Sequence, residues 1–166
     1  LDGDGRPAPE EVTFAPGPAG TAIFNRDLTV TTTHGATLRP LGFAGEAPIY
    51  DAARAERELP DLTIHWTSGC GETLRCADGW FVVTGGPMRG YRGGELRWTY
   101  PSQWPSLHGG HTAPLPEHPG QMIATTRLLG PPVRPAAGEA GELWAINGDK
   151  GNAYLMTTDG LFVAEL

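Results

Sequence analysis

The chain has 166 residues, which is enough for one ordinary domain and too few for two. Its 24 Gly and 16 Pro residues make up about a quarter of it, so little room is left for long helices. A hydrophobic content of 39% with five Trp residues excludes a disordered tail. The net charge of −7, without a basic stripe, disfavours nucleic acids and anionic membrane surfaces as partners. We therefore expect a single all-β domain over residues 1–166.

Short runs rich in β-branched and aromatic residues follow one another along the chain. They predict about ten strands, at residues 12–14, 21–25, 28–33, 62–66, 80–84, 95–100, 121–129, 142–146, 153–158 and 161–166. The run 80–84 is continuously apolar, which is typical of a strand buried on both faces. In 95–100 the alternating residues expected on one face are Leu96, Trp98 and Tyr100. The only helix candidate is 51–59, which is rich in Ala, Arg and Glu and ends before Pro60.

Two glycine-containing turns indicate hairpins. Asp159-Gly160 lies between two apolar runs, which is the strongest short-range hairpin signal. Residues 80–84 and 95–100 form a second candidate hairpin, joined by a Gly-rich connection that ends at Gly93-Gly94. The two regions share one pattern, an apolar strand, a glycine-containing turn and a second strand, as repeated four-stranded blades would.

Two segments resemble a known family. Residues 94–101, Gly-Glu-Leu-Arg-Trp-Thr-Tyr-Pro, resemble the Gly-x-Leu-x-Trp strand of quinoprotein-like β-propellers, and residues 151–164 resemble the blade hairpin that follows it. The resemblance implies propeller blades, and ten strands make about two and a half of them, whereas closed propellers have about four to eight. We therefore expect part of a larger propeller. A β-sandwich with long loops is the alternative.

The acidic opening of the chain is a candidate calcium site. Asp2 and Asp4 alternate with glycines, a spacing that lets carboxylates converge on one hard cation, and Glu11 falls where an EF-hand loop has its bidentate Glu. The opening resembles the calcium loops of FG-GAP repeats, although Ala8 stands where those loops have a late acidic ligand. A solvated Asp-Gly turn is the alternative.

The segment from Tyr100 to Gly120 is predicted to be a long loop, and it contains several side chains that could bind a metal ion or a ligand. His108 and His111, in His-Gly-Gly-His, could bind one metal ion together with Glu117 or His118. The alternative is that these imidazoles only hydrogen-bond backbone groups. Trp104, between Gln103 and Pro105, either offers a stacking platform for a sugar or fills the core.

Cys70 and Cys76 are separated by five residues across a Gly-containing turn, which suits a disulfide in an exported protein. Two unpaired thiols are the alternative. The expected location is extracellular or periplasmic, and no apolar run is long enough to span a membrane.

The function expected from these features is that of an extracellular, non-catalytic propeller segment that binds a protein or glycan, or assembles with other chains or segments of the same propeller. Calcium would stabilise it. The alternative is part of a metal- or quinone-dependent propeller enzyme whose site uses His108 and His111. Residues 161–166 form an apolar edge strand, so we expect another chain or segment to pair with it and to bury Phe162.

Overall fold

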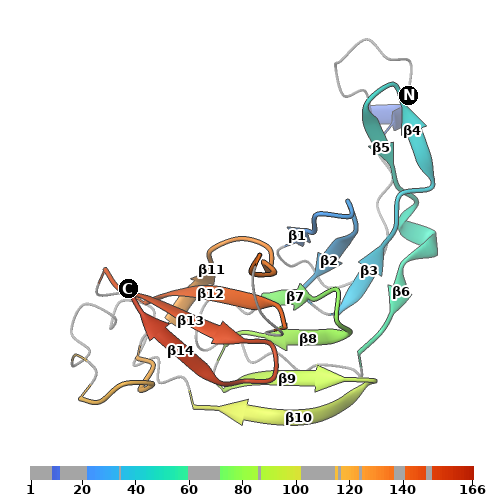
Figure 1. Cartoon of the computed structure of the whole chain (residues 1–166). Coiled ribbons are helices and arrows are strands. Elements are labelled where there is room, and N and C mark those ends of the chain that lie inside the picture. The colour runs from blue at the N-terminus through green and yellow to red at the C-terminus, as the bar shows by residue number, and fades with distance from the viewer. Residues whose placement is uncertain are drawn as a thin grey trace.

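The structure is a computed structural model. It describes residues 9–11, 22–33, 35–59, 72–85, 87–101, 115, 117–123, 125–136, 141–148 and 151–166. Regular structure in these ranges consists of strands and two single 3-10 turns, η1 (Pro9–Glu11) and η2 (Ala52–Arg54), so the all-β prediction is confirmed (Figure 1). Within the same ranges, no helix is long and apolar enough to cross a membrane.

The described strands form three four-stranded antiparallel sheets and one hairpin. The first sheet has the order β1 (Ala22–Phe24), β2 (Val30–Thr32), β3 (Ala36–Leu38) and β6 (Glu56–Arg57). The second sheet contains β7 (Thr73–Arg75), β8 (Trp80–Val83), β9 (Met88–Arg92) and β10 (Glu95–Tyr100). The third contains β11 (Thr125–Leu128), β12 (Leu143–Gly148), β13 (Ala153–Thr157) and β14 (Phe162–Glu165). The hairpin, which we call the arm, consists of β4 (Gly42–Ala44) and β5 (Ala47–Ile49).

In the second and third sheets the strands follow one another in chain order, and in the first sheet the arm is inserted between β3 and β6. Four neighbouring antiparallel strands of this kind are found both in propeller blades and in sandwiches. The described sheets form no closed barrel and are compatible with either architecture.

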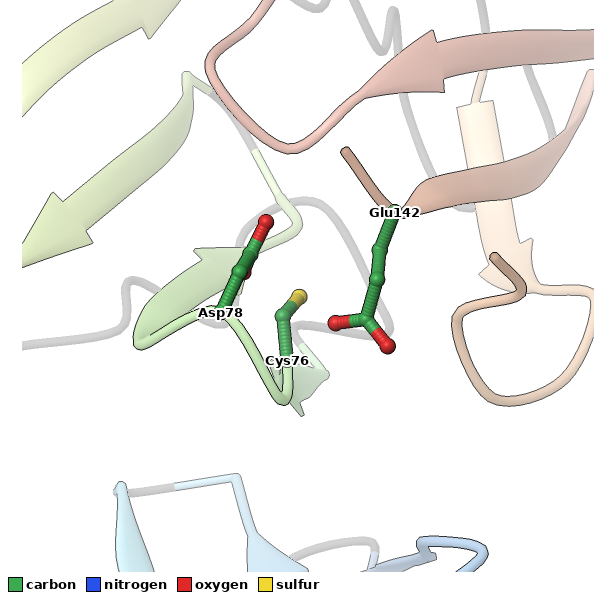
Figure 2. A group of neighbouring side chains, drawn as sticks. All are labelled: Cys76, Asp78 and Glu142. Carbon is green, nitrogen blue, oxygen red and sulfur yellow. The ribbon is translucent and has the colours of Figure 1, made fainter. Parts of the chain in front are cut away.

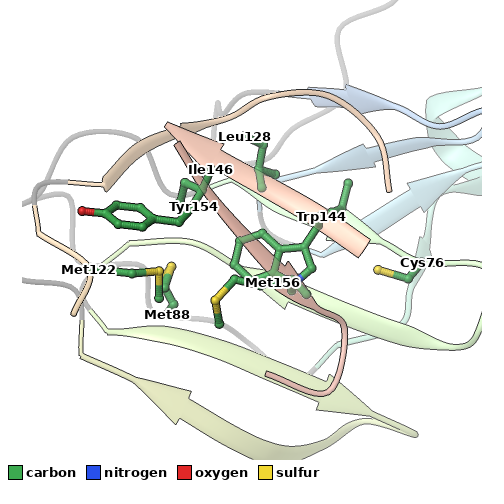
Figure 3. Packing of buried hydrophobic residues seen from close by; sticks show 10 residues of the cluster. Cys76, Met88, Met122, Leu128, Trp144, Ile146, Tyr154 and Met156 are labelled. Carbon is green, nitrogen blue, oxygen red and sulfur yellow. The ribbon is translucent and has the colours of Figure 1, made fainter. Parts of the chain in front are cut away.

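The second sheet contributes to two core clusters, one on each of its faces, and β8 is buried on both. One face meets the third sheet around the main core, which is shown in Figure 3 and contains Leu74, Val82, Met88, Trp144, Ile146, Tyr154 and Met156. The other face forms a smaller cluster with Leu59, which follows β6. Val82 belongs to the main core, whereas Phe81 and Val83 belong to the smaller cluster. The prediction that 80–84 is buried on both faces is therefore confirmed.

The predicted hairpin between 80–84 and 95–100 is wrong. The connection contains a further strand, β9, which pairs with β8 on one side and β10 on the other. Gly93 and Gly94, both with positive φ, form the tight β9–β10 turn.

The predicted common face of β10 is also only partly right. A register shift between Leu96 and Trp98 places Leu96 opposite Tyr91 and Trp98 opposite Gly90. Neighbours across a ladder share a face, so this bulge turns Leu96 away from the face of Trp98.

The predicted helix at 51–59 is wrong as well. Asp51 caps a single 3-10 turn by accepting a hydrogen bond from the N–H of Ala53 at 2.9 Å. The chain then becomes extended, because Glu56 and Arg57 pair with β3 and Leu59 enters the smaller core cluster. Tertiary pairing thus overrides the helix propensity of Ala, Arg and Glu.

The predicted hairpin tip at Asp159-Gly160 is confirmed, and its turn recurs. In the turn Thr157–Leu161, the N–H of the first residue, Thr157, donates to the carbonyl of the fifth, Leu161, at 2.9 Å. The N–H of the fourth residue, Gly160, donates to the carbonyl of Thr157 at 3.1 Å. The same two bonds close residues 25–29 and residues 76–80. In each turn the fourth residue has a positive φ and the third is an aspartate. The three turns therefore form a structural repeat.

The last strand, β14, is paired and partly buried within the chain itself. β14 pairs with β13, and Phe162 is half-buried against the main core of the same chain. Leu161, Val163 and Leu166 remain exposed, so the expectation that another chain or segment pairs with this strand and buries Phe162 further stays a prediction. The strands predicted at 12–14 and 62–66 lie outside the described residues.

Candidate functional site

The β7–β8 turn and the residue before β12 bring three possible metal ligands together. Cys76 and Asp78 belong to the turn, and Glu142 approaches them from the third sheet (Figure 2). The Cys76 Sγ atom and one carboxylate oxygen from each acid lie within 4.8 Å of one another. We call these three residues the Cys-Asp-Glu cluster.

Hydrogen bonds between the two sheets fix this cluster. Glu142 accepts the N–H of Ala77 at 2.5 Å through Oε2, and Asp78 accepts the Thr158 hydroxyl at 2.8 Å through Oδ2. The N–H of Thr158 also donates to the carbonyl of Glu142 at 3.2 Å. The carboxylates are therefore oriented by groups outside the cluster itself.

The cluster contains two acids, and two of its three residues are buried. Cys76 is 1% exposed and Glu142 is 8% exposed. Burial raises the pKa of the Cys76 thiol, and the charges of Asp78 and Glu142 raise it further, whereas Arg75 acts in the opposite direction. Arg75 itself pairs with Glu58 at 3.1 Å and with Asp27 at 3.7 Å. Among the described residues, no ion pair includes Asp78 or Glu142.

A pocket of about 190 Å³ lies where the three sheets meet, beside the cluster. Its lining includes Asn25 and Asp27 from the first sheet's turn, Arg75 from the second sheet and Glu142 from the third. Asn25 is 9% exposed, and its amide nitrogen donates to Thr29 and Thr31. Its Oδ1 atom is buried without a hydrogen-bond partner in the described part of the chain.

Most of the residues singled out in the sequence lie outside the described residues: Asp2, Asp4, Cys70, Trp104, His108 and His111. The backbone of Glu11 ends η1. Glu117 and His118 are exposed, and His118 lines a second pocket of about 290 Å³ together with Tyr100 and Gln121. The calcium site, the His108/His111 site and the Cys70–Cys76 disulfide stay predictions; in the structure Cys76 is a buried free thiol in the main core.

Sequence reasoning noticed Cys76 but missed Asp78 and Glu142. A usable signal existed for Asp78, because Ala77-Asp78-Gly79 has the pattern of Thr158-Asp159-Gly160, which was recognised as a turn. No local pattern announces Glu142, whose carboxylate meets the N–H of a residue 65 positions earlier.

No protein-family model, curated protein or solved structure matches the chain. The resemblance to quinoprotein-like propellers therefore stays a prediction, and function is argued from the molecule itself.

Proposed function

We propose that the chain is a non-catalytic assembly module whose arm pairs edge to edge with the arm of a second copy. The observation that carries the proposal is the exposed apolar face of this arm. Figure 1 shows β4 and β5 projecting away from the three sheets. In the described part of the chain these two strands pair with each other and with no other strand.

The arm exposes large apolar side chains on one face. Phe43 is 57% exposed and lies opposite Pro48, and Leu41, two residues before Phe43, is 49% exposed. Partners across a ladder share a face, so Phe43 and Pro48 form one apolar surface, and Leu41 exposes a further apolar side chain just before β4. An isolated two-stranded hairpin is marginally stable at best, and added strands on an apolar face stabilise it.

The two edges of the arm differ. β5 contains Pro48, which has no N–H and therefore cannot donate a hydrogen bond to a further strand at that edge. β4 consists of Gly42, Phe43 and Ala44, with no charged residue and no proline to deter pairing. Pairing through β4 is therefore favoured.

A second copy is the partner that best suits this edge. Two arms joined through β4 would form a four-stranded antiparallel sheet, the size of each of the chain's other sheets. The pairing would be two-fold symmetric, so the assembly would stop at a dimer, and closed symmetry of this kind is found in most homo-oligomers. The strands are short, so we expect an affinity in about the micromolar range rather than tighter.

Sedimentation velocity of the full chain over a range of concentrations, with a thiol reductant present, tests the proposal. We expect a reversible monomer–dimer equilibrium that Phe43→Ser shifts to monomer without loss of the near-UV circular dichroism signal. Phe24→Ser is the matched control, because Phe24 is similarly exposed on β1. A wild-type chain that stays monomeric, or an equal effect of both variants, contradicts the proposal.

A further inference from the structure

The Cys-Asp-Glu cluster has the geometry of a metal site with three protein ligands. Its three donor atoms lie within 4.8 Å of one another, whereas ligand atoms around a tetrahedral ion are about 3.3–3.8 Å apart. Small side-chain rotations close that difference. Two of the ligands come from one tight turn and the third from the neighbouring sheet, so an ion there would also join the second and third sheets.

The surrounding hydrogen bonds are those that metal ligands need. One oxygen of Glu142 accepts the N–H of Ala77, and one oxygen of Asp78 accepts the Thr158 hydroxyl. Each carboxylate keeps lone pairs for an ion, since an ionised carboxylate has about four acceptor positions. Outer groups that orient ligands in this way are typical of metal sites.

The charge of the cluster also favours a cation. Two carboxylates and a thiol lie together, two of the three residues are buried, and no described ion pair offsets the acids. A buried carboxylate such as that of Glu142 is unfavourable without a partner, and in proteins such groups are paired or coordinate metals.

The pocket beside the cluster supplies an independent sign of a ligand. Glu142 belongs both to the cluster and to the lining of the pocket. Asn25 lines the same pocket, and its buried Oδ1 has no hydrogen-bond partner in the described part of the chain. Buried acceptors in native proteins are nearly always paired, and a metal-bound water in the pocket is a suitable donor.

We infer that Cys76, Asp78 and Glu142 bind one divalent cation of the zinc class, and that a further coordination position opens to the pocket lined by Asn25. A thiolate ligand favours Zn²⁺ over the hard cations Ca²⁺ and Mg²⁺, and carboxylates complete zinc sites at similar distances. On binding, Sγ bonds to the ion and the thiol proton passes to water. The site does not involve the arm, so its test is independent of the proposed assembly.

Titration of the chelator-treated full chain with Co²⁺, followed by Zn²⁺, tests the inference. We expect a near-ultraviolet thiolate-to-cobalt absorption band that saturates at one equivalent and is removed by Zn²⁺. Cys76→Ser should abolish the band. Glu142→Gln keeps an acceptor for the Ala77 N–H and should lower Zn²⁺ affinity at least tenfold, even if Cys76→Ser fails to fold.

Two variants are matched controls. Asp159→Asn alters the same position of the repeated turn as Asp78 without removing a proposed ligand, and Cys70→Ser removes the other thiol. Both should keep the band and the Zn²⁺ affinity of the wild type. The inference is overturned if the wild type gives no band, if Cys70→Ser abolishes it as completely as Cys76→Ser, or if Glu142→Gln binds Zn²⁺ as tightly as the wild type.

Discussion

Asp27, Asp78 and Asp159 hold the same position in three turns that share one hydrogen-bonding pattern, yet their carboxylates have different partners. Asp159 accepts the hydroxyl of Thr157 within its own hairpin. Asp78 bonds to Thr158 in another sheet and belongs to the Cys-Asp-Glu cluster. The turn explains why an aspartate is present, because its side chain accepts local donors. Which partner the carboxylate has outside its turn depends on the neighbouring sheet.

Asp27 should make the stability of the protein depend on acid pH. Burial acts to raise its pKa, but the hydrogen bonds from the Thr29 hydroxyl and N–H and the charge of Arg75 outweigh burial, so the pKa lies below its ordinary value. A carboxylate with a lowered pKa in the folded state contributes stability above its unfolded pKa, near about 4, and this contribution disappears as pH falls through the folded pKa.

We therefore expect Asp27→Asn to be less stable than the wild type near neutral pH, by well under about 1 kcal/mol because Asp27 is largely exposed. The difference in unfolding free energy should shrink toward zero below about pH 4. Urea unfolding of both proteins at a series of pH values measures it. A difference that is constant with pH, or that grows on acidification, contradicts the assigned role of Asp27.

At the scale of the element, several strands escaped prediction, namely β3, β4, β5, β6, β7 and β9, and β9 shows why. Its sequence, Met-Arg-Gly-Tyr-Arg, has a glycine at the centre and flanking glycines, which are signals of a loop. In the structure the Trp98 indole from β10 occupies the space above Gly90, and the Arg92 guanidinium lies over the Trp80 ring at 5.6 Å. Side chains of the neighbouring strands therefore pack against β9 and stabilise it, and no local sequence pattern reveals these contacts.

Gly90→Ala should be strongly destabilising. An added Cβ would lie 1.9 Å from the Trp98 Nε1 atom, so the indole would have to move. Trp98 would then lose its hydrogen bond to the Thr158 carbonyl, at 3.0 Å, and its stacking on Trp144, at 6.3 Å between ring centroids. We expect a loss of about 2–4 kcal/mol in unfolding free energy, measured by urea denaturation.

Two comparisons isolate the clash. Gly42→Ala also places a methyl group on a strand glycine, but nothing lies within 4 Å of the added Cβ, so its effect should stay within about 1 kcal/mol. In a Trp98→Leu background, Gly90→Ala should cost less than it does in the wild type, because the clashing ring is absent. Equal costs in the two backgrounds would show that the indole is not the cause.

At the scale of the whole molecule, the sequence predicted strands better than their assembly. Runs such as 80–84 and 153–158 were predictable because apolar periodicity is local. The division into sheets was not, because charged residues distant in the chain join them: Glu58 binds Arg75 between the first and second sheets, at 3.1 Å. The Cys-Asp-Glu cluster is likewise a product of that assembly, so only its cysteine was noticed.

Glu72 is a second acid, beside Glu142, that joins the second and third sheets. Its side chain is buried, and it accepts the Leu128 N–H at 2.7 Å and the Arg127 guanidinium at 3.1 Å. Glu72→Ala would leave the buried Leu128 N–H without its acceptor, whereas the Arg127 guanidinium is 58% exposed and stays solvated, so we expect a loss of about 1–3 kcal/mol. Glu72→Gln keeps an oxygen for the Leu128 N–H and should cost less than about 1 kcal/mol.

Urea unfolding followed by near-UV circular dichroism and tryptophan fluorescence measures these losses and shows whether the sheets unfold together. If Glu72 couples the two sheets, Glu72→Ala should separate the two transitions, because a cooperative unit gives coincident ones. Glu95→Gln is the control, since Glu95 pairs with Arg97 at 2.8 Å on the exposed surface and should contribute less than about 1 kcal/mol. A Glu72→Ala variant that is as stable as Glu95→Gln would mean that the apolar core alone holds the third sheet in place.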